Sequence, residues 1–234
     1  MRPRIAVNCD VEISGRERFF LYSDYADALI EAGAEPVVLS PDPAMLPQLR
    51  ELDGVLLTGG DDYTFSVADP AAPPARYVEM HSRRERFDIS LAQEALRLDL
   101  PLLGICAGFQ LVARLTGGEL IGDIEEEVGS EVHHRRRSPE DEDPRHEVTW
   151  EAPPPPGVEG QSSDVMSRHH QGVRSLGHGW STWASAPDGM IEGAIGPGRW
   201  QLLVQWHPEL SPRDRLSRSI FTALVAAART TARS

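Results

Sequence analysis

Short apolar runs alternate along the first half of the sequence with longer segments whose apolar residues recur at helical spacing. The apolar runs lie at residues 4–9, 36–39, 54–58 and 101–105, and residues 107–115 return to a helical pattern. Strands that are apolar throughout are buried on both faces, which is typical of a parallel sheet covered by helices on both sides. The sequence therefore predicts an α/β fold, a three-layer α/β/α sandwich with a mostly parallel central sheet.

The middle of the sequence has a different character. Residues 125–156 hold two acidic clusters, the run HHRRR at 133–137 and four consecutive prolines at 153–156. We interpret this segment as an exposed, smaller β-excursion with a short strand near residues 147–150, and not as a domain linker. Further β-segments are expected at 180–186, 190–194 and 201–206, before a final amphipathic helix. We therefore expect residues 1–234 to form one domain.

Composition narrows the partners and the compartment. A net charge of −13 repels nucleic acid and anionic membranes, so we expect neither as a partner. The N-terminus does not fit a signal peptide, and no stretch is long and apolar enough to span a bilayer. Two cysteines, Cys9 and Cys106, give no disulfide framework, which favours a cytoplasmic location. The oligomeric state stays open, with a homodimer among the alternatives.

The segment LLGICAGFQ at residues 102–110 places Cys106 where a buried strand ends and a helix begins. Gly104 and Gly108 lie two residues to either side, where larger side chains would collide in a tight strand-to-helix turn. The helix N-terminus would favour the thiolate, and the N–H of Ala107 would be available to a developing oxyanion. The alternative interpretation is an inert structural cysteine.

A second chemically suggestive segment, LLVQWHPE, occupies residues 202–209. His207 could accept the thiol proton, and Glu209 could fix the tautomer and orientation of its ring. Pro208 stiffens the turn between them. The alternative is an ordinary surface His and Glu at a strand end, and the pairing with the Cys106 turn favours the catalytic interpretation.

Other signals are weaker. The histidines at 133, 134, 146, 169 and 170 include no pair with helical or finger-type ligand spacing and a third ligand nearby, so we predict no metal and no cofactor. The HHRRR run is interpreted as a solvated loop, although an anion-binding patch is an alternative. Cys9 is expected in the core. Gly59 and Gly60 could form a simple turn or allow close approach to a substrate carbonyl.

The motifs G-I-C-x-G-x-Q and Q-W-H-P-E resemble the class I glutamine amidotransferase superfamily. More narrowly, the chain resembles the free-standing gamma-glutamyl-gamma-aminobutyrate hydrolase-like branch, peptidase C26. The other matching pieces lie at residues 24–28, 32–33, 52–60, 117–120, 167–171 (SRHHQ) and 188–192.

This resemblance implies an α/β/α sandwich with Cys106, His207 and Glu209 as the catalytic triad. It implies an oxyanion hole made by the backbone N–H groups of Gly60 and Ala107. It also implies that a set of polar side chains contacts the substrate: Gln110, Ser167, His169, His170 and Gln171. Three positions depart from the branch: Ala107 replaces the usual Arg, Met166 replaces Asn, and the proline that usually follows Gly59-Gly60 is absent. These departures bear on the substrate.

The reaction predicted in this way is hydrolysis of a small-molecule γ-glutamyl amide through a thioester, for example γ-glutamyl-γ-aminobutyrate or a related γ-glutamyl amine. One alternative uses the same chemistry, namely a glutaminase subunit that supplies ammonia to a synthase partner. Another is a non-catalytic binding module on the same fold, which an intact Cys106, His207 and Glu209 disfavours.

Overall fold

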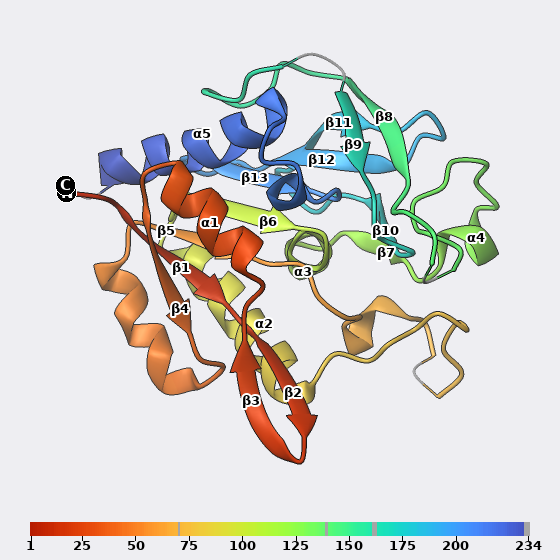
Figure 1. The fold of residues 1–234 in the computed structure, drawn as a ribbon, viewed down its shortest axis with the longest axis horizontal. Coiled ribbons are helices and arrows are strands. Elements are labelled where there is room, and N and C mark those ends of the chain that lie inside the picture. Colours follow the sequence, from red (N-terminus) through yellow and green to blue (C-terminus); the bar gives the residue numbers. More distant parts are fainter. Residues whose placement is uncertain (70, 139, 161–162, 232–234) are drawn as a thin grey trace.

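The structure is a computed structural model that describes residues 1–69, 71–138, 140–160 and 163–231. In that part of the chain, eleven strands form one mixed sheet (Figure 1). Its parallel half runs in the order β4 (Glu35–Leu39), β1 (Arg4–Asn8), β5 (Gly54–Leu57), β6 (Leu102–Ile105) and β13 (Gln201–Val204). The antiparallel half continues through β12 (Ile191–Ile195), β11 (Ser181–Ser185), β8 (Arg145–Trp150) and β9 (Ser163–Met166), and β7 (Glu119–Ile121) and β10 (Gly172–Ser175) join it at β12.

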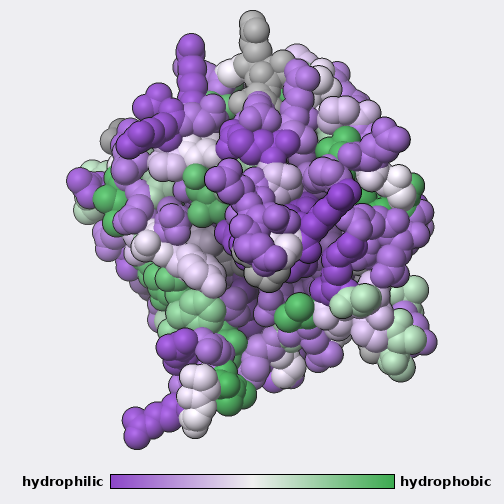
Figure 2. Space-filling view, turned by 45° about the vertical axis from the view of Figure 1, so that its right-hand side comes forward, coloured by the Kyte–Doolittle hydropathy of each residue, from purple (hydrophilic) through white to green (hydrophobic). Residues whose placement is uncertain are grey.

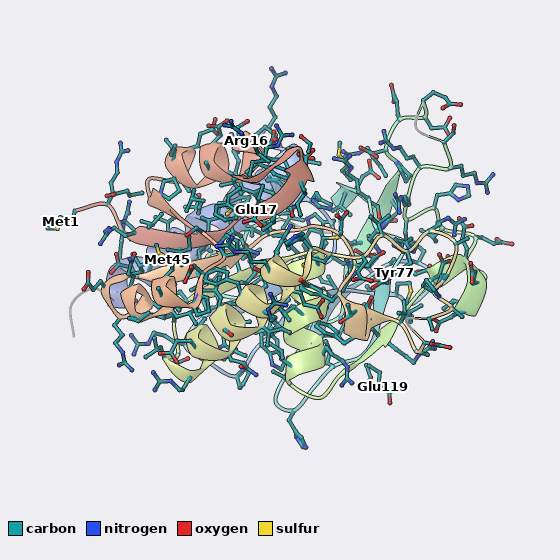
Figure 3. The ribbon with its side chains drawn as sticks, turned by 90° about the horizontal axis from the view of Figure 1, so that it is seen from below. Met1, Arg16, Glu17, Met45, Tyr77 and Glu119 are labelled. Carbon is teal, nitrogen blue, oxygen red and sulfur yellow. The ribbon has the colours of Figure 1, made fainter. Side chains whose placement is uncertain are left out.

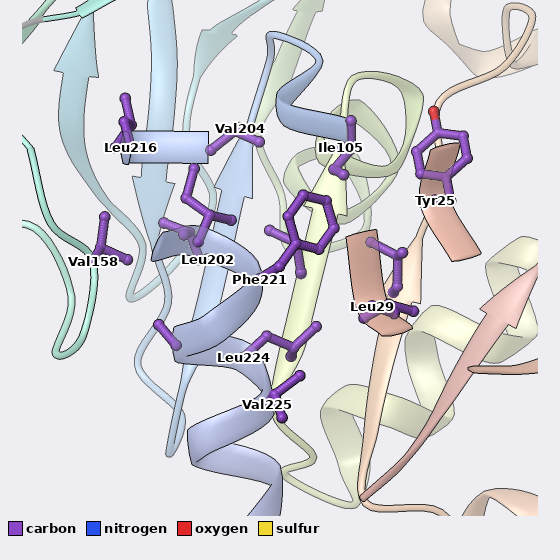
Figure 4. Packing of buried hydrophobic residues seen from close by; sticks show 14 of the residues in the cluster. Tyr25, Leu29, Ile105, Val158, Leu202, Val204, Leu216, Phe221, Leu224 and Val225 are labelled. Carbon is purple, nitrogen blue, oxygen red and sulfur yellow. The ribbon is translucent and has the colours of Figure 1, made fainter. Parts of the chain in front are cut away.

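Helices cover both faces of the parallel half. The helices on one face are α1 (Ser23–Glu31) and α5 (Arg215–Thr231), and those on the other are α2 (Ser82–Arg97) and α3 (Ala107–Leu115). Successive residues of β1 serve opposite faces: Ile5 packs in the cluster of α5, and Ala6 in that of α2. Figure 4 shows Phe221 and Leu224 of α5 packed against strands of the parallel half. The predicted three-layer α/β sandwich is confirmed.

The segment interpreted as an exposed excursion is partly buried. β8, which contains the strand predicted near 147–150, pairs with β11 and extends the main sheet. His134 and Val148 are buried, with 4% and 0% of their surface exposed, so the expectation of a solvated loop is wrong for His134. The reason is that this segment packs between strands of the antiparallel half. Within the predicted domain, residues 70, 139, 161–162 and 232–234 lie outside the described residues.

A separate two-stranded hairpin was not predicted. β2 (Asp10–Ser14) and β3 (Arg16–Phe20) pair around Gly15, whose φ of 80° suits glycine. Figure 3 shows Arg16 and Glu17 at its tip, on the side of the view away from Glu119. The remaining short elements are η1 (Pro43–Glu51), η2 (Thr64–Ser66), α4 (Ile124–Glu127) and η3 (Pro208–Leu210).

The face drawn in Figure 2 is mainly hydrophilic, with hydrophobic residues scattered over it. Among the described residues, none of the helices combines the length and the apolar character that a membrane crossing requires.

Candidate active site

Four parallel strands end at one edge of the sheet, the edge at which open α/β sheets bind their ligands. β6 leads into Cys106, β5 into Gly59 and Gly60, and β13 toward His207, while β1 leads into Cys9. Segments far apart in the sequence are therefore brought together by the strand order alone.

Cys106 lies on a strained turn between β6 and α3. Its φ of 51° and ψ of −106° are unusual for a residue with a side chain. Its N–H donates to the Val204 carbonyl at 2.9 Å, which ties the turn to β13. A Cβ atom on Gly104 would lie 2.6 Å from the Leu203 side chain, and one on Gly108 would lie 2.5 Å from the Leu57 carbonyl. The predicted turn and its need for two glycines are confirmed.

His207 and Glu209 form a pair beside this turn. Nδ1 of His207 lies 2.6 Å from Oε1 of Glu209, and the glutamate is buried. A Cβ atom on Gly59 would lie 2.9 Å from His207 Cε1 and 3.5 Å from Cys106 Cβ, so both side chains pack against the same glycine. Burial opposes the charged ring, but Glu209 and a hydrogen-bonded Cys106 outweigh it and raise the pKa of His207 to about 10. An imidazolium beside the sulfur is thereby stabilised.

Gly59 is held by hydrogen bonds to both its N–H and its carbonyl. The Gly59 N–H donates to the Tyr25 hydroxyl at 3.0 Å, and the Gly59 carbonyl accepts from Arg84 Nη2 at 2.7 Å. Because a trans peptide directs its N–H opposite to its carbonyl, the bond from Arg84 turns the Gly60 N–H away from the guanidinium. Gly60 lines the same cavity as Cys106. This arrangement suits an oxyanion donor.

Arg84 is the functional residue that sequence reasoning missed. Only 1% of its surface is exposed, and it pairs with Asp10 at 2.7 Å and with Asp88 at 3.2 Å. Asp88 also accepts hydrogen bonds from Asn8 at 2.9 Å and Tyr63 at 3.0 Å. In the sequence, Arg84 belongs to the charged run SRRER, which indicates a solvated helix start and gives no sign of burial.

A cavity opens on one side of Cys106. Four of the five side chains predicted to contact substrate line it, namely Gln110, His169, His170 and Gln171, together with Gly60, Asp61, Asp62, Val78, Arg135 and Arg168. The fifth, Ser167, is not among its lining residues. Ser167 is fully buried and donates to the His134 carbonyl at 2.8 Å, so it supports the cavity wall from behind.

A second cavity lies on the other side of Cys106. It is lined by Asp10, Tyr22, Asp24, Tyr25, Gly59, Gly60, Arg168, His207, Glu209 and Leu210. Cys106, Gly60 and Arg168 line both cavities.

Three buried histidines converge behind the first cavity. His134, His146 and His169 each direct one ring nitrogen toward Glu192, and these four groups could hold a metal ion. The expectation of no metal rested on ligand spacing along the sequence. Spacing misses this cluster because its members come from four separate segments.

An α/β sheet that carries a cysteine on a strained strand-to-helix turn, beside a His–Glu pair, is the arrangement of a cysteine-type amidohydrolase. This chain is a hydrolase of that class. It belongs to the family Peptidase C26, whose family model matches residues 4–209.

Curated relatives agree with this assignment. The gamma-glutamyl-gamma-aminobutyrate hydrolase PuuD of Escherichia coli strain K12 is 29% identical over 94% of this chain and 91% of its own length. A Mycobacterium tuberculosis protein named for glutamine amidotransferase activity is 32% identical, over 89% of this chain and 68% of its own. Among solved structures, a Thermoplasma acidophilum protein described as a GMP synthase subunit shares the fold, with a TM-score of 0.67, 17% identity and coverage of 98% of this chain and 96% of that one.

Proposed function

We propose that this enzyme hydrolyses γ-glutamyl amides through a thioester at Cys106. The observation that carries the proposal is the strained Cys106 beside the His207–Glu209 pair, with one cavity on each side. The Cys106 thiolate attacks the γ-carbonyl carbon, and the resulting oxyanion is held by the N–H groups of Gly60 and Ala107. The Ala107 N–H belongs to the first turn of α3, whose N–H groups have no partner within the helix.

Two proton transfers complete the cycle. The His207 imidazolium gives its proton to the leaving nitrogen, the C–N bond breaks, and the free amine leaves a γ-glutamyl thioester. Neutral His207 then takes a proton from water, whose oxygen attacks the thioester carbonyl. The C–S bond breaks, glutamate departs, and the thiolate and imidazolium are restored. Glu209 keeps the ring oriented in both halves of the cycle.

The charges of the first cavity suit an α-amino acid head group. Arg135 and Arg168 supply cations for the α-carboxylate, and Asp61 and Asp62 supply anions for the α-ammonium group. His170 lies 3.0 Å from the Asp62 carboxylate and orients it. The glutamyl part is therefore assigned to this cavity.

The second cavity receives the leaving amine. Its lining residues Tyr22 and Leu210 offer apolar surface beyond the scissile bond, and Asp24 offers a negative charge. An amine larger than ammonia fits this side. The lining holds three carboxylates, Asp10, Asp24 and Glu209, against the cations Arg168 and His207, so a cationic chain is favoured over an anionic one. γ-Glutamyl-γ-aminobutyrate, which the name of the Escherichia coli relative specifies, is the reference substrate for comparison.

The test is kcat/KM for a panel of γ-glutamyl amines and for glutamine, with no other protein present. We expect at least one amine with a bulky leaving group to be cleaved faster than glutamine, and Asp24→Asn to reduce the preference for cationic amines. Hydrolysis of glutamine alone, and only after a second protein is added, would instead identify a glutaminase that works with a synthase.

A further inference from the structure

Four buried side chains meet at one point in the antiparallel half of the sheet. His146 lies in β8, Glu192 lies in β12, His134 precedes β8, and His169 lies between β9 and β10. One donor atom of each lies within 4.8 Å of the others, and none of the four residues has more than 7% of its surface exposed. Glu192 Oε1 is 3.4 Å from His134 Nδ1, 3.5 Å from His146 Nε2 and 3.4 Å from His169 Nε2.

In each ring, the inner nitrogen faces Glu192 and the outer nitrogen faces away from it. The partner of the outer nitrogen determines which of the two nitrogens carries the ring hydrogen. His134 Nε2 lies 2.8 Å from the Asp188 carboxylate, and His169 Nδ1 lies 2.8 Å from the Gln171 carbonyl. His146 Nδ1 lies 3.2 Å from the Glu147 carbonyl. Carbonyl and carboxylate oxygens only accept hydrogen bonds, so each outer nitrogen carries the ring hydrogen and each inner nitrogen of a neutral ring presents a lone pair.

When all three rings are neutral, the ring nitrogens that face Glu192 and the Glu192 carboxylate are all electron donors. Within the described part of the chain, the inner nitrogens of the three rings and both oxygens of Glu192 have no hydrogen-bond partner. Three lone pairs and a carboxylate that face one another in a buried site repel each other unless a cation lies between them.

The geometry points to a tetrahedral metal ion as that cation, and we propose that the cluster binds one Zn²⁺ per chain. Zinc bonds of about 2.0–2.1 Å place neighbouring tetrahedral ligands about 3.3 Å apart, close to the 3.4 and 3.5 Å between Glu192 Oε1 and the three nitrogens. All four donor atoms lie within 4.8 Å of one another, so the nitrogens need only a small inward shift to reach the same ion. Three imidazoles and one carboxylate form a complete ligand set for zinc. Because four protein ligands leave no open position, the ion has a structural role.

The ion would hold the wall of the Cys106 cavity in place. Arg135 follows His134, and Arg168 and His170 flank His169, and these three neighbours line the cavity. The Ser167 hydroxyl and the His169 N–H both reach the His134 carbonyl, at 2.8 and 2.9 Å, so the two ligand-bearing loops are already joined. Zinc would fasten these loops to β8 and β12.

The test measures zinc directly and needs no substrate. Chelator-treated Cys106→Ala protein, which cannot bind zinc through the catalytic thiolate, is titrated with Zn²⁺ by calorimetry and then melted with and without the ion. We expect one Zn²⁺ per chain and a raised melting temperature. Asp188→Asn retains all four ligands and is expected to weaken binding by about 10- to 100-fold. Glu192→Gln is expected to weaken it further.

His133→Ala is the matched control, because this exposed histidine is adjacent to His134 but outside the cluster. Its zinc affinity should equal that of the parent. Two results would overturn the proposal. No stoichiometric binding and no thermal shift in the parent protein would mean that a shared proton, and not a metal ion, balances the charge of the cluster. Glu192→Gln and Asp188→Asn variants that bind zinc as tightly as the parent would place the ion elsewhere.

Discussion

Two cysteines follow strands of the same parallel sheet, yet their surroundings differ in almost every respect. Cys9 comes after β1 and Cys106 after β6, with β5 between the two strands. Both thiols are free and buried. The Cys9 thiol donates to the Leu39 carbonyl at 3.3 Å, and burial raises its pKa to about 11. Cys106 instead occupies a strained turn at the start of a helix, and its side chain packs beside His207 against Gly59.

The comparison shows that the element following the strand, a second strand or a helix, determines whether a cysteine at this edge of the sheet can serve as a nucleophile. After Cys9 the chain continues into β2, so the segment that follows this cysteine does not begin a helix. Arg84 is the nearby cation, but its charge is taken up by Asp10 and Asp88, which oppose its effect on the Cys9 thiol. The same arginine acts on the catalytic side of the molecule by fixing the Gly59 carbonyl.

The largest effect is expected from removing one thiol and not the other. Cys106→Ala should lower kcat by at least about 10⁴-fold, because no other group can form the thioester. Cys9→Ala should leave kcat within about twofold and cost on the order of 1 kcal/mol in free energy of unfolding. Activity assays and urea denaturation on both variants measure this. Near-normal turnover by Cys106→Ala would remove the basis for the comparison.

Arg84 contacts both regions, because it pairs with Asp10 next to Cys9 and donates a hydrogen bond to the Gly59 carbonyl near Cys106. Its removal should have the second-largest effect. Arg84→Met leaves Asp10 and Asp88 without their buried cation, which should reduce the free energy of unfolding by about 3–5 kcal/mol. It should also lower kcat, because the Gly59 carbonyl loses its partner. Arg83→Met, the adjacent surface arginine paired with Glu17 and Asp42, should cost about 1 kcal/mol or less. Equal losses from the two variants would argue against the buried network.

Alkylation sharpens the comparison without mutation. Since the pKa of Cys9 is raised to about 11, its thiolate should be roughly 100-fold scarcer than that of an ordinary cysteine at neutral pH. We expect iodoacetamide to label Cys106 first by at least that factor, read by peptide mass spectrometry. Equal labelling, or a preference for Cys9, would contradict the environments described here.

The smallest predicted effect is a shift in pH dependence. Folding raises the pKa of His207 to about 10, so its protonation stabilises the fold fully below about pH 6.5, and this contribution is lost as the pH rises toward 10. The same deprotonation should produce the alkaline limb of kcat/KM. Glu209→Gln removes a charge that favours the imidazolium, so the limb should move down by about one pH unit or more. An unchanged limb would show that Glu209 does not set this pKa.

The sequence predicted those elements whose signal is local. β5 and β6 are apolar throughout, β13 is apolar after Gln201, and all three are buried at every position, so their runs are visible without a structure. The Cys106 turn was predicted because the glycines two residues before and after it indicate a tight turn in which larger side chains would collide. The β2–β3 hairpin was missed because Arg16, Glu17 and Arg18 are exposed and Val11 is the only buried residue of the two strands, which leaves no alternating apolar pattern.

The non-local parts of the site could not be predicted in the same way. Arg84 is buried only because Asp10, Asp88 and Gly59 arrive from other segments. The inner nitrogens of His134, His146 and His169 share a point only after β8 joins β11. Both clusters form because the order of the strands in the sheet brings their members together. The spacing of residues in the sequence does not indicate that order.

The central claim is that Cys106, and not Cys9, carries the acyl group during turnover. The most direct measurement uses γ-glutamyl-4-nitroanilide, whose weakly basic amine leaves readily, so that hydrolysis of the thioester limits the rate. Reactions are quenched with acid during turnover, and the peptides are read by mass spectrometry. We predict the mass of one glutamyl group on the peptide that contains Cys106 and an unmodified Cys9. Nitroaniline release with no acyl group on Cys106, or with the group on Cys9, would contradict the account.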